Sequence, residues 1–364
     1  MKNTFGNHVA VTLFGESHQE EIGVVIDGLT PGMKIDEEFI KKQLDRRRPS
    51  GKISTARKEK DEFRIVSGVF KGRATGTPLC ILIPNQNVSS KDYEKTKHLL
   101  RPSHADYTAF CKYHGFQDYR GGGHFSGRLT APLVAAGAIA LDALSKKGIL
   151  IGTHVKRCSG VLDRNFENLE EDIRSLKEQS FAVLDENKAK KMKKKIEEVG
   201  AQGDSVGGVL ETVILGLPKG VGEPWFDSFE SVMAHGLFSI PAVKGVEFGL
   251  GYGFADQKGS EVNDAFRMEG ETVVTSSNNN GGVNGGITNG MPVTFTCVIK
   301  PTPSIYKEQQ TVNFAKKENA TISIEGRHDP AIVHRAGVVV ESMAALAVMD
   351  LLCTRYGTDY FAED

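Results

Sequence analysis

Residues 335–356 constrain the fold of this chain more than any other segment. They read RAGVVVESMAALAVMDLLCTRY, and apolar side chains recur on nearly every side of an ideal helix. A helix without a polar face must be buried against other parts of a protein. The pattern therefore predicts a helix that lies in the core or in a subunit interface.

Further helices are expected where helical composition is bounded by capping residues. Asp36 can cap a helix that stops before Pro49. Asp185 can cap a lysine-rich helix that ends at Gly200. An alanine-rich run is closed by Gly148, and glycine often ends helices. The expected helices are residues 36–48, 128–147 and 185–200.

Strand-like runs are interspersed with these helices and are separated by short turns. Residues 22–26 form one such run, residues 207–221 have strand character, and residues 63–84 read as two strands joined by a glycine-bearing turn. Short connections favour antiparallel pairing, and no linker divides the chain. We therefore predict an α+β fold in which at least two sheets pack on helices, in a single domain that covers residues 1–364.

The composition is that of a globular protein and narrows the classes of function. The chain of 364 residues has a formal net charge of -1, which argues against nucleic acid as its main partner. Its five cysteines are scattered without C-x-x-C spacing, so neither a disulfide framework nor a zinc site is expected, and a reducing cytoplasm is the simpler location. No apolar run approaches about 18 residues, so no membrane span is expected.

The lysine run of residues 185–200 admits two interpretations. Clustered lysines can bind nucleic acid, but a charge run on a helix is more often a solvated face. We favour the solvated face, because the run lacks interleaved aromatic residues.

Two motifs in the first fifty residues combine reactive or anion-binding side chains. In FGESHQ (residues 14–19), Ser17 and His18 are neighbours. Adjacent residues of a strand point to opposite faces, so the pair does not indicate a catalytic triad, and a structural turn is the alternative. In DRRRPSGK (residues 45–52), three guanidinium groups would bind phosphate or carboxylate groups, or they would form a solvated helix end that the helix dipole favours.

LRPSHADYTAF (residues 100–110) contains a histidine at an expected helix start. Pro102 and Ser103 predict a turn that opens a helix, with His104 in its first turn. The positive end of a helix attracts anions and lowers the pKa of a nearby histidine. The alternative is an ordinary capped helix start with a surface histidine.

RGGGHFSGRLTAPL (residues 120–133) lacks side chains at three consecutive positions just before a histidine and an arginine. Glycines allow a backbone to approach a flat or phosphorylated ligand closely, and Arg128 then stands near the start of the alanine-rich helix. The spacing is not G-x-G-x-x-G, and no strand-turn-helix with a following acidic residue indicates a dinucleotide fold.

Three further segments in the C-terminal half of the chain are rich in glycine or in charged residues. Residues 278–290 must form turns, and KPTPSIYK follows at residues 300–307. EGRHDPAIVHRAG (residues 325–337) concentrates charges at the entry of the buried helix, which is costly unless they bind a ligand. Their spacing fits no standard metal site, so no metal is expected. With the motifs above, these stretches predict a site for an anionic, phosphorylated small molecule, with histidines placed for proton transfer.

Nine motifs occur along the chain in this order: FGESHQ, DRRRP, RPSHADYT, YRGGG, GDSVGG, SIPAVKGVEFG, GGVNGGITNG, KPTPS and GRHDP. In these motifs and their order, the chain resembles the chorismate synthase family over essentially its whole length. The resemblance implies a β-α-β sandwich, with helices packed between antiparallel sheets, and assembly as a homotetramer. It also implies a lyase of aromatic amino-acid biosynthesis, which converts 5-enolpyruvylshikimate 3-phosphate to chorismate and phosphate by 1,4-anti elimination.

The resemblance implies a flavin cofactor and a role for each motif. The family requires reduced FMN, and NADPH only where the enzyme reduces its own flavin; since no separate reductase segment is visible, flavin reduced elsewhere is favoured. His18 would protonate the departing phosphate, and His104 would manage the proton on the reduced flavin. Asp329, with Ser17, would help to deprotonate flavin N5. The residues implied to bind the substrate are Arg47, Arg48, Arg101, Arg128 and Arg327. Those implied to bind the flavin are His124, Phe125, Ser126, Pro241, Ala242, Gly285, Lys300, Pro301, Thr302, Pro303, Ser304 and Arg327.

Several positions depart from the family pattern. After the three glycines the family has Arg-Ser-Ser-Ala-Arg-Glu, whereas this chain has His124 in place of the first Arg and Leu129 in place of the Glu. Gln19 replaces a Gly, Pro241 replaces an Asn, and Ile53 stands where a second basic residue is expected. These changes concern flavin and phosphate contacts, so we expect them to alter flavin binding and its pH dependence more than the reaction.

Two other classes of function stay open at the level of sequence. A flavin-binding protein without lyase activity would result if the changes at residues 124–129 disabled the site, although His18, His104 and Asp329 are intact. A nucleic-acid-binding protein would use the arginines of DRRRP and the lysine helix, against which the net charge of -1 counts.

Overall fold

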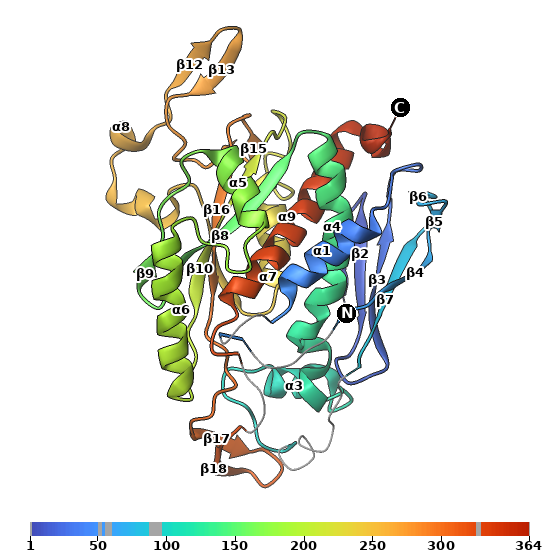
Figure 1. Cartoon of the computed structure of the whole chain (residues 1–364), viewed down its shortest axis with the longest axis vertical. Helices are drawn as coiled ribbons and strands as arrows, with labels where there is room; N and C mark the ends of the chain where they lie inside the picture. Colours follow the sequence, from blue (N-terminus) through green and yellow to red (C-terminus); the bar gives the residue numbers. More distant parts are fainter. Residues whose placement is uncertain (1, 50–52, 55–59, 87–96, 325–328, 364) are drawn as a thin grey trace.

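Helices lie between two antiparallel sheets in the computed structural model of the chain (Figure 1). The structure describes residues 2–363 except 50–52, 55–59, 87–96 and 325–328. The first sheet has the strand order β1 (Thr4–Phe5), β2 (Ala10–Gly15), β3 (Glu21–Asp27), β7 (Leu79–Pro84) and β4 (Arg64–Ser67). The second has the order β11 (Val243–Phe248), β16 (Val293–Ile299), β10 (Gly208–Leu215), β8 (Leu150–Cys158) and β9 (Val161–Leu162).

The layer between the sheets is made of helices that are distant in sequence. Helix α9 packs against α4, α1 and α7 and meets the second sheet at β8, whereas α4 meets the first sheet at β3 and β7. A Cβ atom on Gly137 of α4 would lie 2.2 Å from the Cβ atom of Ser342 on α9, so the small residue permits this close crossing. These helices are α1 (Glu37–Arg47), α4 (Thr130–Lys146), α7 (Phe229–Ser239) and α9 (Val333–Tyr356).

Other elements cover the outer face of the second sheet or connect the layers. Helix α5 packs on β8, and α6 contacts β9. The other helices of the described residues are α3 (Asp106–Tyr113), α5 (Leu169–Lys177), α6 (Glu186–Ala201), α8 (Gly259–Val262), η1 (Arg120–Phe125), η2 (Gly127–Leu129), η3 (Gly251–Asp256) and η4 (Thr358–Phe361). The small hairpins are β5–β6 (Val69–Phe70, Arg73–Ala74), β12–β13 (Phe266–Glu269, Thr272–Thr275), β14–β15 (Val283–Asn284, Ile287–Thr288) and β17–β18 (Gln309–Asn313, Glu318–Ile322).

The predicted core helix is confirmed as α9, and nearly every residue from its first turn to Cys353 is buried. By length and composition alone, η2–α4 and α9 could each cross a membrane, but 83% and 94% of their most apolar windows are buried inside this fold. Both are therefore the core helices that pack the two sheets together.

A buried ion pair fixes α1 onto α9. Arg46 binds both carboxylate oxygens of Glu341, with a shortest contact of 2.6 Å, and Glu341 is 1% exposed. The same carboxylate accepts a hydrogen bond from the backbone N–H of Thr153 in β8. Glu341 thus ties the end of α1, which carries the arginine motif, to the sheet behind it.

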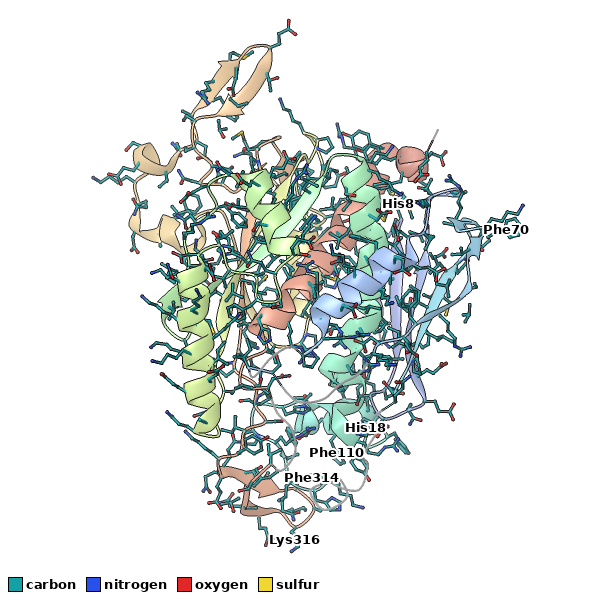
Figure 2. The ribbon with its side chains drawn as sticks, in the orientation of Figure 1. His8, His18, Phe70, Phe110, Phe314 and Lys316 are labelled. Atoms are coloured by element: carbon teal, nitrogen blue, oxygen red, sulfur yellow. The ribbon has the colours of Figure 1, made fainter. Side chains whose placement is uncertain are left out.

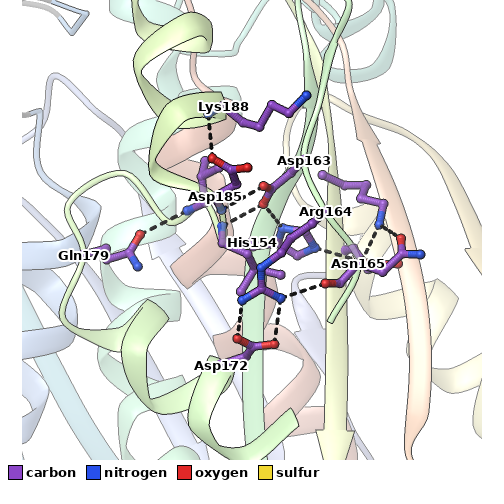
Figure 3. A network of polar contacts seen from close by, with 12 residues as sticks. His154, Asp163, Arg164, Asn165, Asp172, Gln179, Asp185 and Lys188 are labelled. Atoms are coloured by element: carbon purple, nitrogen blue, oxygen red, sulfur yellow. Dashed lines mark hydrogen bonds and ion pairs between the residues drawn. The ribbon is translucent and has the colours of Figure 1, made fainter. Parts of the chain in front are cut away.

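A second buried network joins β8, β10 and the start of α6 (Figure 3). Nδ1 of His154 lies 2.7 Å from a carboxylate oxygen of Asp163, and its Nε2 lies 2.8 Å from one of Glu211. Asp163 also accepts the backbone N–H groups of Leu184 and Asp185, which lead into α6. Burial would raise the pKa of the Asp163 carboxyl, but these hydrogen bonds outweigh it and hold that pKa below its usual value.

Most expected elements are confirmed, with shifted ends. Asp36 caps α1 and Asp185 caps α6, as predicted, but α6 continues to Ala201, one residue beyond Gly200. For residues 63–84 the sequence predicts two strands with one turn. They instead form β4 and β7 with the hairpin β5–β6 between them, because Lys71 and Gly72 both take left-handed φ values and make a tight turn there.

The lysine helix behaves as a solvated face. Ala189, Met192 and Ile196 turn inward from α6, while Lys190 and Lys194 are exposed and pair with glutamates one turn away. The favoured interpretation of the charge run is therefore confirmed.

Candidate active site

Two buried arginines from separate helices meet at one end of the inner layer. Arg47 is the last residue of α1, which ends because Pro49 follows, and Arg128 lies in η2 just before α4. Each is 6% exposed. Their guanidinium groups both bind Asp61, at 2.7 Å from Nη2 of Arg47 and in a short contact from Nη1 of Arg128.

Asp61 is a buried anion between two cations. Burial would raise the pKa of the Asp61 carboxyl, but the charges of Arg47 and Arg128 outweigh it and hold the pKa below its usual value. Burial lowers the pKa of Arg47, and the charges of Arg335 and Arg128 act in the same direction. The ionised carboxylate is therefore what makes two adjacent buried guanidinium groups tolerable here.

A cavity of about 260 Å³ opens beside this cluster. Four guanidinium groups and two carboxylates line it, together with an apolar wall. Its lining consists of Arg47, Arg48, Pro49, Asp61, Ser126, Gly127, Arg128, Thr130, Ile240, Pro241, Asp329, Ile332, Arg335, Ala336 and Val339. The formal surplus of positive charge suits an anion, and the apolar wall suits a ring.

Two arginines that line this cavity each carry a buried nitrogen donor without a partner among the described residues. Nε of Arg47 and Nε of Arg48 are both buried without a hydrogen bond in that part of the chain. A buried donor without an acceptor is unfavourable, so an anionic ligand that reached these atoms would satisfy them.

The glycine turn lies against two of the predicted catalytic histidines. A Cβ atom on Gly121 would fall 2.0 Å from Cε1 of His18, and one on Gly122 would fall 3.3 Å from Cε1 of His104. Both glycines have left-handed φ values, of 59° and 89°. Side chains are absent from this turn because two imidazole rings pack against its backbone.

Ser17 and His18 lie in the turn after β2, not in a strand. Ser17 Oγ is 3.1 Å from His18 Nδ1, and the backbone N–H of Ser17 donates to the carbonyl of Gly123. The alternative interpretation, a structural turn, is therefore confirmed. The expectation that neighbouring side chains diverge does not apply, because it holds only for extended residues.

His104 is oriented by an acidic neighbour. Its Nδ1–H donates to Asp106 at 2.7 Å, and the same carboxylate binds Nε and Nη2 of Arg101. The prediction of His104 in the first helical turn is wrong, because α3 begins at Asp106 after a left-handed Ser103. The loop is folded around Asp106 instead, and the hydrogen bonds overcome burial to hold the pKa of Asp106 well below its usual value.

The KPTPS segment lies beside this histidine loop. Nζ of Lys300 donates to the carbonyl of Ser103 at 2.6 Å, and the backbone N–H of Lys300 donates to the carbonyl of Ala242. The hydroxyl of Thr302 is buried without a partner among the described residues. Two predicted groups of ligand-binding residues, at 241–242 and 300–304, are thereby adjacent in space.

The β17–β18 hairpin supports the loop from outside. Phe314 packs on Phe110 of α3, with ring centroids 4.9 Å apart, and both labelled side chains lie at the same end of the molecule as His18 (Figure 2). Thr311 donates from its hydroxyl to the carbonyl of Leu100, close to Arg101. The hairpin therefore fixes the segment that leads to His104.

The sequence profile of the family described as chorismate synthase matches residues 9–353. The chain belongs to the chorismate synthase family. A chorismate synthase from Pyrococcus abyssi is 47% identical over 96% of this chain and 97% of its own length. That of Thermococcus kodakarensis is 44% identical with the same coverage. A structure titled Crystal Structure of Chorismate Synthase superposes with a TM-score of 0.75 at 28% identity, over 97% of this chain and 94% of that one.

Three predictions are confirmed by these similarities. They are the family itself, the α+β fold with helices between antiparallel sheets, and the enzyme class, a lyase acting on phosphates in aromatic amino-acid biosynthesis. Membership of the chorismate synthase family also implies a flavin cofactor and a small-molecule substrate.

The cavity gathers some of the residues that the chorismate synthase resemblance implied, and the glycine turn gathers others. Of the implied residues, those that line the cavity are Arg47, Arg48, Ser126, Arg128, Pro241 and Asp329. Those at or beside the glycine turn are Ser17, His18, His104 and His124. The turn and the cavity are joined by residues 120–128, so both groups belong to one region of the fold.

His124, Phe125 and Arg101 have protein partners. Nδ1–H of His124 donates to the carbonyl of Gly15 at 2.8 Å, and Phe125 contacts Tyr113 edge to face. Arg101 is engaged by Asp106 and does not line the cavity. Pro301, Pro303 and Ser304 continue the segment of Lys300, and Arg327 lies outside the described residues.

Gly285 is not brought to the cavity. It lies in the β14–β15 turn, whose neighbour Gly286 accepts a hydrogen bond from the backbone N–H of Phe229 at the start of α7. The cavity residues Ile240 and Pro241 follow the other end of α7, and a helix of 11 residues is about 16 Å long. Within one chain, Gly285 is therefore separated from the site by the length of that helix.

Three polar residues of the site have no individual role in the sequence prediction. Asp61 bridges the arginines, Asp106 orients His104, and Arg335 binds Asp329 at 2.6 Å while its Nε donates to the carbonyl of Arg47. Asp106 and Arg335 stand inside motifs that the sequence singled out. Asp61 lies in the charge run RKEKDEF, which has no local feature that separates it from a surface loop.

Proposed function

We propose that the chain converts 5-enolpyruvylshikimate 3-phosphate to chorismate and phosphate by 1,4-anti elimination, with reduced FMN as its cofactor. One observation carries the proposal: a cationic cavity with two unsatisfied buried guanidinium nitrogens lies next to a glycine turn that holds two histidines. The departing phosphate group gains negative charge during an elimination, and preorganised cations stabilise this charge.

In this proposal the arginines bind the substrate. Arg47, Arg48 and Arg128 line the cavity and would bind its phosphate and carboxylates through paired hydrogen bonds. Arg101 and Arg327 complete the proposed set on the basis of the family motifs. The formal surplus of positive charge is what a substrate with three anionic groups requires.

The residues present fit a flavin. An apolar wall of Ile240, Ile332 and Val339 would pack against the ring, and the buried hydroxyl of Thr302 would satisfy a polar atom of the ligand. The other proposed contacts are His124, Phe125, Ser126, Pro241, Ala242, Lys300, Pro301, Pro303 and Ser304, with Gly285 contributed from a second copy. Reduced FMN, when bound, supplies transient electron density that assists the cleavage of the C–O bond without net oxidation.

The chain's own acids and bases would handle the protons. His18, whose Nδ1 is engaged by Ser17, would deliver a proton to the departing phosphate from Nε2. His104, oriented through Nδ1 by Asp106, would control the proton on the reduced flavin. Asp329, positioned by Arg335 at the cavity wall, would help with Ser17 to remove from flavin N5, as a proton, the hydrogen that the substrate loses in the elimination.

The proposal also covers the oligomeric state and the cellular location of the enzyme. We place the enzyme in the cytoplasm as a homotetramer of single-domain chains, residues 1–364, in which helices shared by both sheets form one core. Reduced flavin would come from outside the chain, and added NADPH alone would then not support turnover.

The test is anaerobic turnover with both products followed together. Purified protein is mixed with 5-enolpyruvylshikimate 3-phosphate and chemically reduced FMN, and chorismate and phosphate are measured over time. Equal release of both products is expected. Tight flavin binding without either product would contradict the proposal and favour a flavin-binding protein that has lost lyase activity.

A further inference from the structure

Asp61 stands out because it is a carboxylate at the centre of an anion-binding site. Its side chain is 0% exposed and its backbone has a left-handed φ of 49°. A buried carboxylate that pairs with two arginines competes with a phosphorylated substrate for their positive charge. We therefore expect Asp61 to have a structural role that offsets this competition with the substrate.

The two arginines depend on Asp61 unequally. Arg128 is also held by Nε to the side-chain oxygen of Asn85 at 3.1 Å and by Nη2 to the carbonyl of Pro84 at 3.2 Å. Arg47 has a 3.4 Å contact from Nη1 to Thr130, and its Nε is buried without a partner among the described residues. Asp61 is thus the short, charged contact that orients Arg47.

Without Asp61, the neighbouring charges would push Arg47 out of place. Burial is the largest cause that lowers the pKa of Arg47, and the charges of Arg335 and Arg128 lower it further. These two neighbours therefore disfavour the charged form of Arg47. An unpaired buried guanidinium is strongly unfavourable, so the side chain would turn toward water. The guanidinium group of Arg47 would then no longer line the cavity.

We propose that Asp61 is a positioning residue of the phosphate site, which acts by holding the guanidinium group of Arg47 toward the cavity. The proposal deepens the proposed function, on which it rests. Asp61 does not touch the substrate; it binds Nη2 of Arg47 and so keeps the guanidinium group among the residues that line the cavity.

The test is a double-mutant cycle on kcat/KM. Asp61→Asn is expected to lower kcat/KM about 30-fold in the wild-type chain, mainly by raising KM, but less than about threefold in an Arg47→Ala chain, because its effect passes through Arg47. Glu170→Gln, which removes the carboxylate of an exposed pair with Arg174, is the matched control and should change neither constant. Equal losses in both backgrounds, or unchanged kinetics, would overturn the proposal.

A binding measurement separates this inference from the proposed function. Calorimetry with inorganic phosphate should show weaker binding to Asp61→Asn than to wild type, even if neither protein turns over substrate. Equal or tighter binding would mean that Asp61 only offsets charge. Should Asp61→Asn fail to fold, Asp61→Glu keeps the charge but moves it by one methylene, and it should raise KM at least fivefold; an unchanged KM would refute the positioning role.

Discussion

The imidazole of His18 lies so close to the backbone of Gly121 that a methyl group on this glycine would fall 2.0 Å from Cε1. The contact joins the turn after β2 to the glycine turn before α4, and the carbonyl of Gly123 accepts the N–H of Ser17 beside it. The position of His18 is therefore set by the absence of a side chain more than 100 residues later in the chain.

Replacing Gly121 by alanine is expected to displace His18 and to lower kcat at least 100-fold. A misplacement of about 1 Å in a reacting group can cost that factor, and the left-handed φ of 59° adds backbone strain to the substitution. Steady-state kinetics with saturating substrate and reduced FMN would measure the effect.

Gly259→Ala is the control for that substitution. Gly259 has no left-handed φ, and its nearest neighbour would be 3.7 Å from a new Cβ atom, so activity and stability should stay unchanged. A Gly121→Ala enzyme with wild-type kcat would show that the close approach of His18 to the glycine turn does not matter for catalysis.

Glu341→Ala is expected to destabilise the fold by about 3–5 kcal/mol, because it leaves Arg46 buried without its partner. Urea unfolding at pH 7 would measure the change. Glu170→Ala, in a pair whose side chains are 61% and 72% exposed, should stay within about 0.5 kcal/mol of wild type. Similar losses for the two variants would contradict the role of Glu341 as the anchor of α1.

The network around His154 is expected to make the fold sensitive to acid. The pKa of Asp163 is depressed in the folded chain, so its stabilising contribution is present above the unfolded pKa, about 4, and is lost as pH falls through the lower folded value. Asp163→Asn should therefore be less stable than wild type at pH 6, by about 2 kcal/mol, with a gap that narrows at pH 3. Unfolding free energies that stay parallel from pH 6 to pH 3 would rule this out.

His124 is expected to make FMN binding depend on pH. The family has arginine here, whereas a histidine gains its charge only as the solution becomes acidic, so affinity for the flavin phosphate should rise as pH falls from 8 to 5.5. His124→Arg should bind FMN with little change over the same range. Fluorescence titrations that give matching affinities for both proteins at every pH would refute the hypothesis.

Much of the fold could be predicted because the sequence patterns are local. The apolar surface of α9 and the caps at Asp36 and Asp185 depend only on neighbouring residues. The hairpin β5–β6 was missed, since its four paired residues are too few for an alternating pattern. The start of α3 was misplaced, because the bonds of Asp106 to Arg101 and His104 compete with a helical turn.

The site was predictable where family motifs carry it, and not where a residue acts through tertiary contacts. Arg47 and Arg128 are marked by their motifs, but their common partner Asp61 is 14 and 67 residues away from them. Likewise, nothing local shows that Gly121 lies under His18, or that Gly285 is separated from the cavity by α7. Such relationships appear only when distant segments are brought together.

The central claim is that the cavity between Arg47, Arg48 and Arg128 receives the phosphorylated substrate. The most direct measurement is a crystal structure of the chain with 5-enolpyruvylshikimate 3-phosphate and FMN. The account predicts anionic substrate oxygens within about 2.7–3.2 Å of guanidinium nitrogens of Arg47 and Arg128, with His18 beside the leaving phosphate. Substrate bound elsewhere, with these arginines still engaged only by Asp61 and their other protein partners, would contradict it.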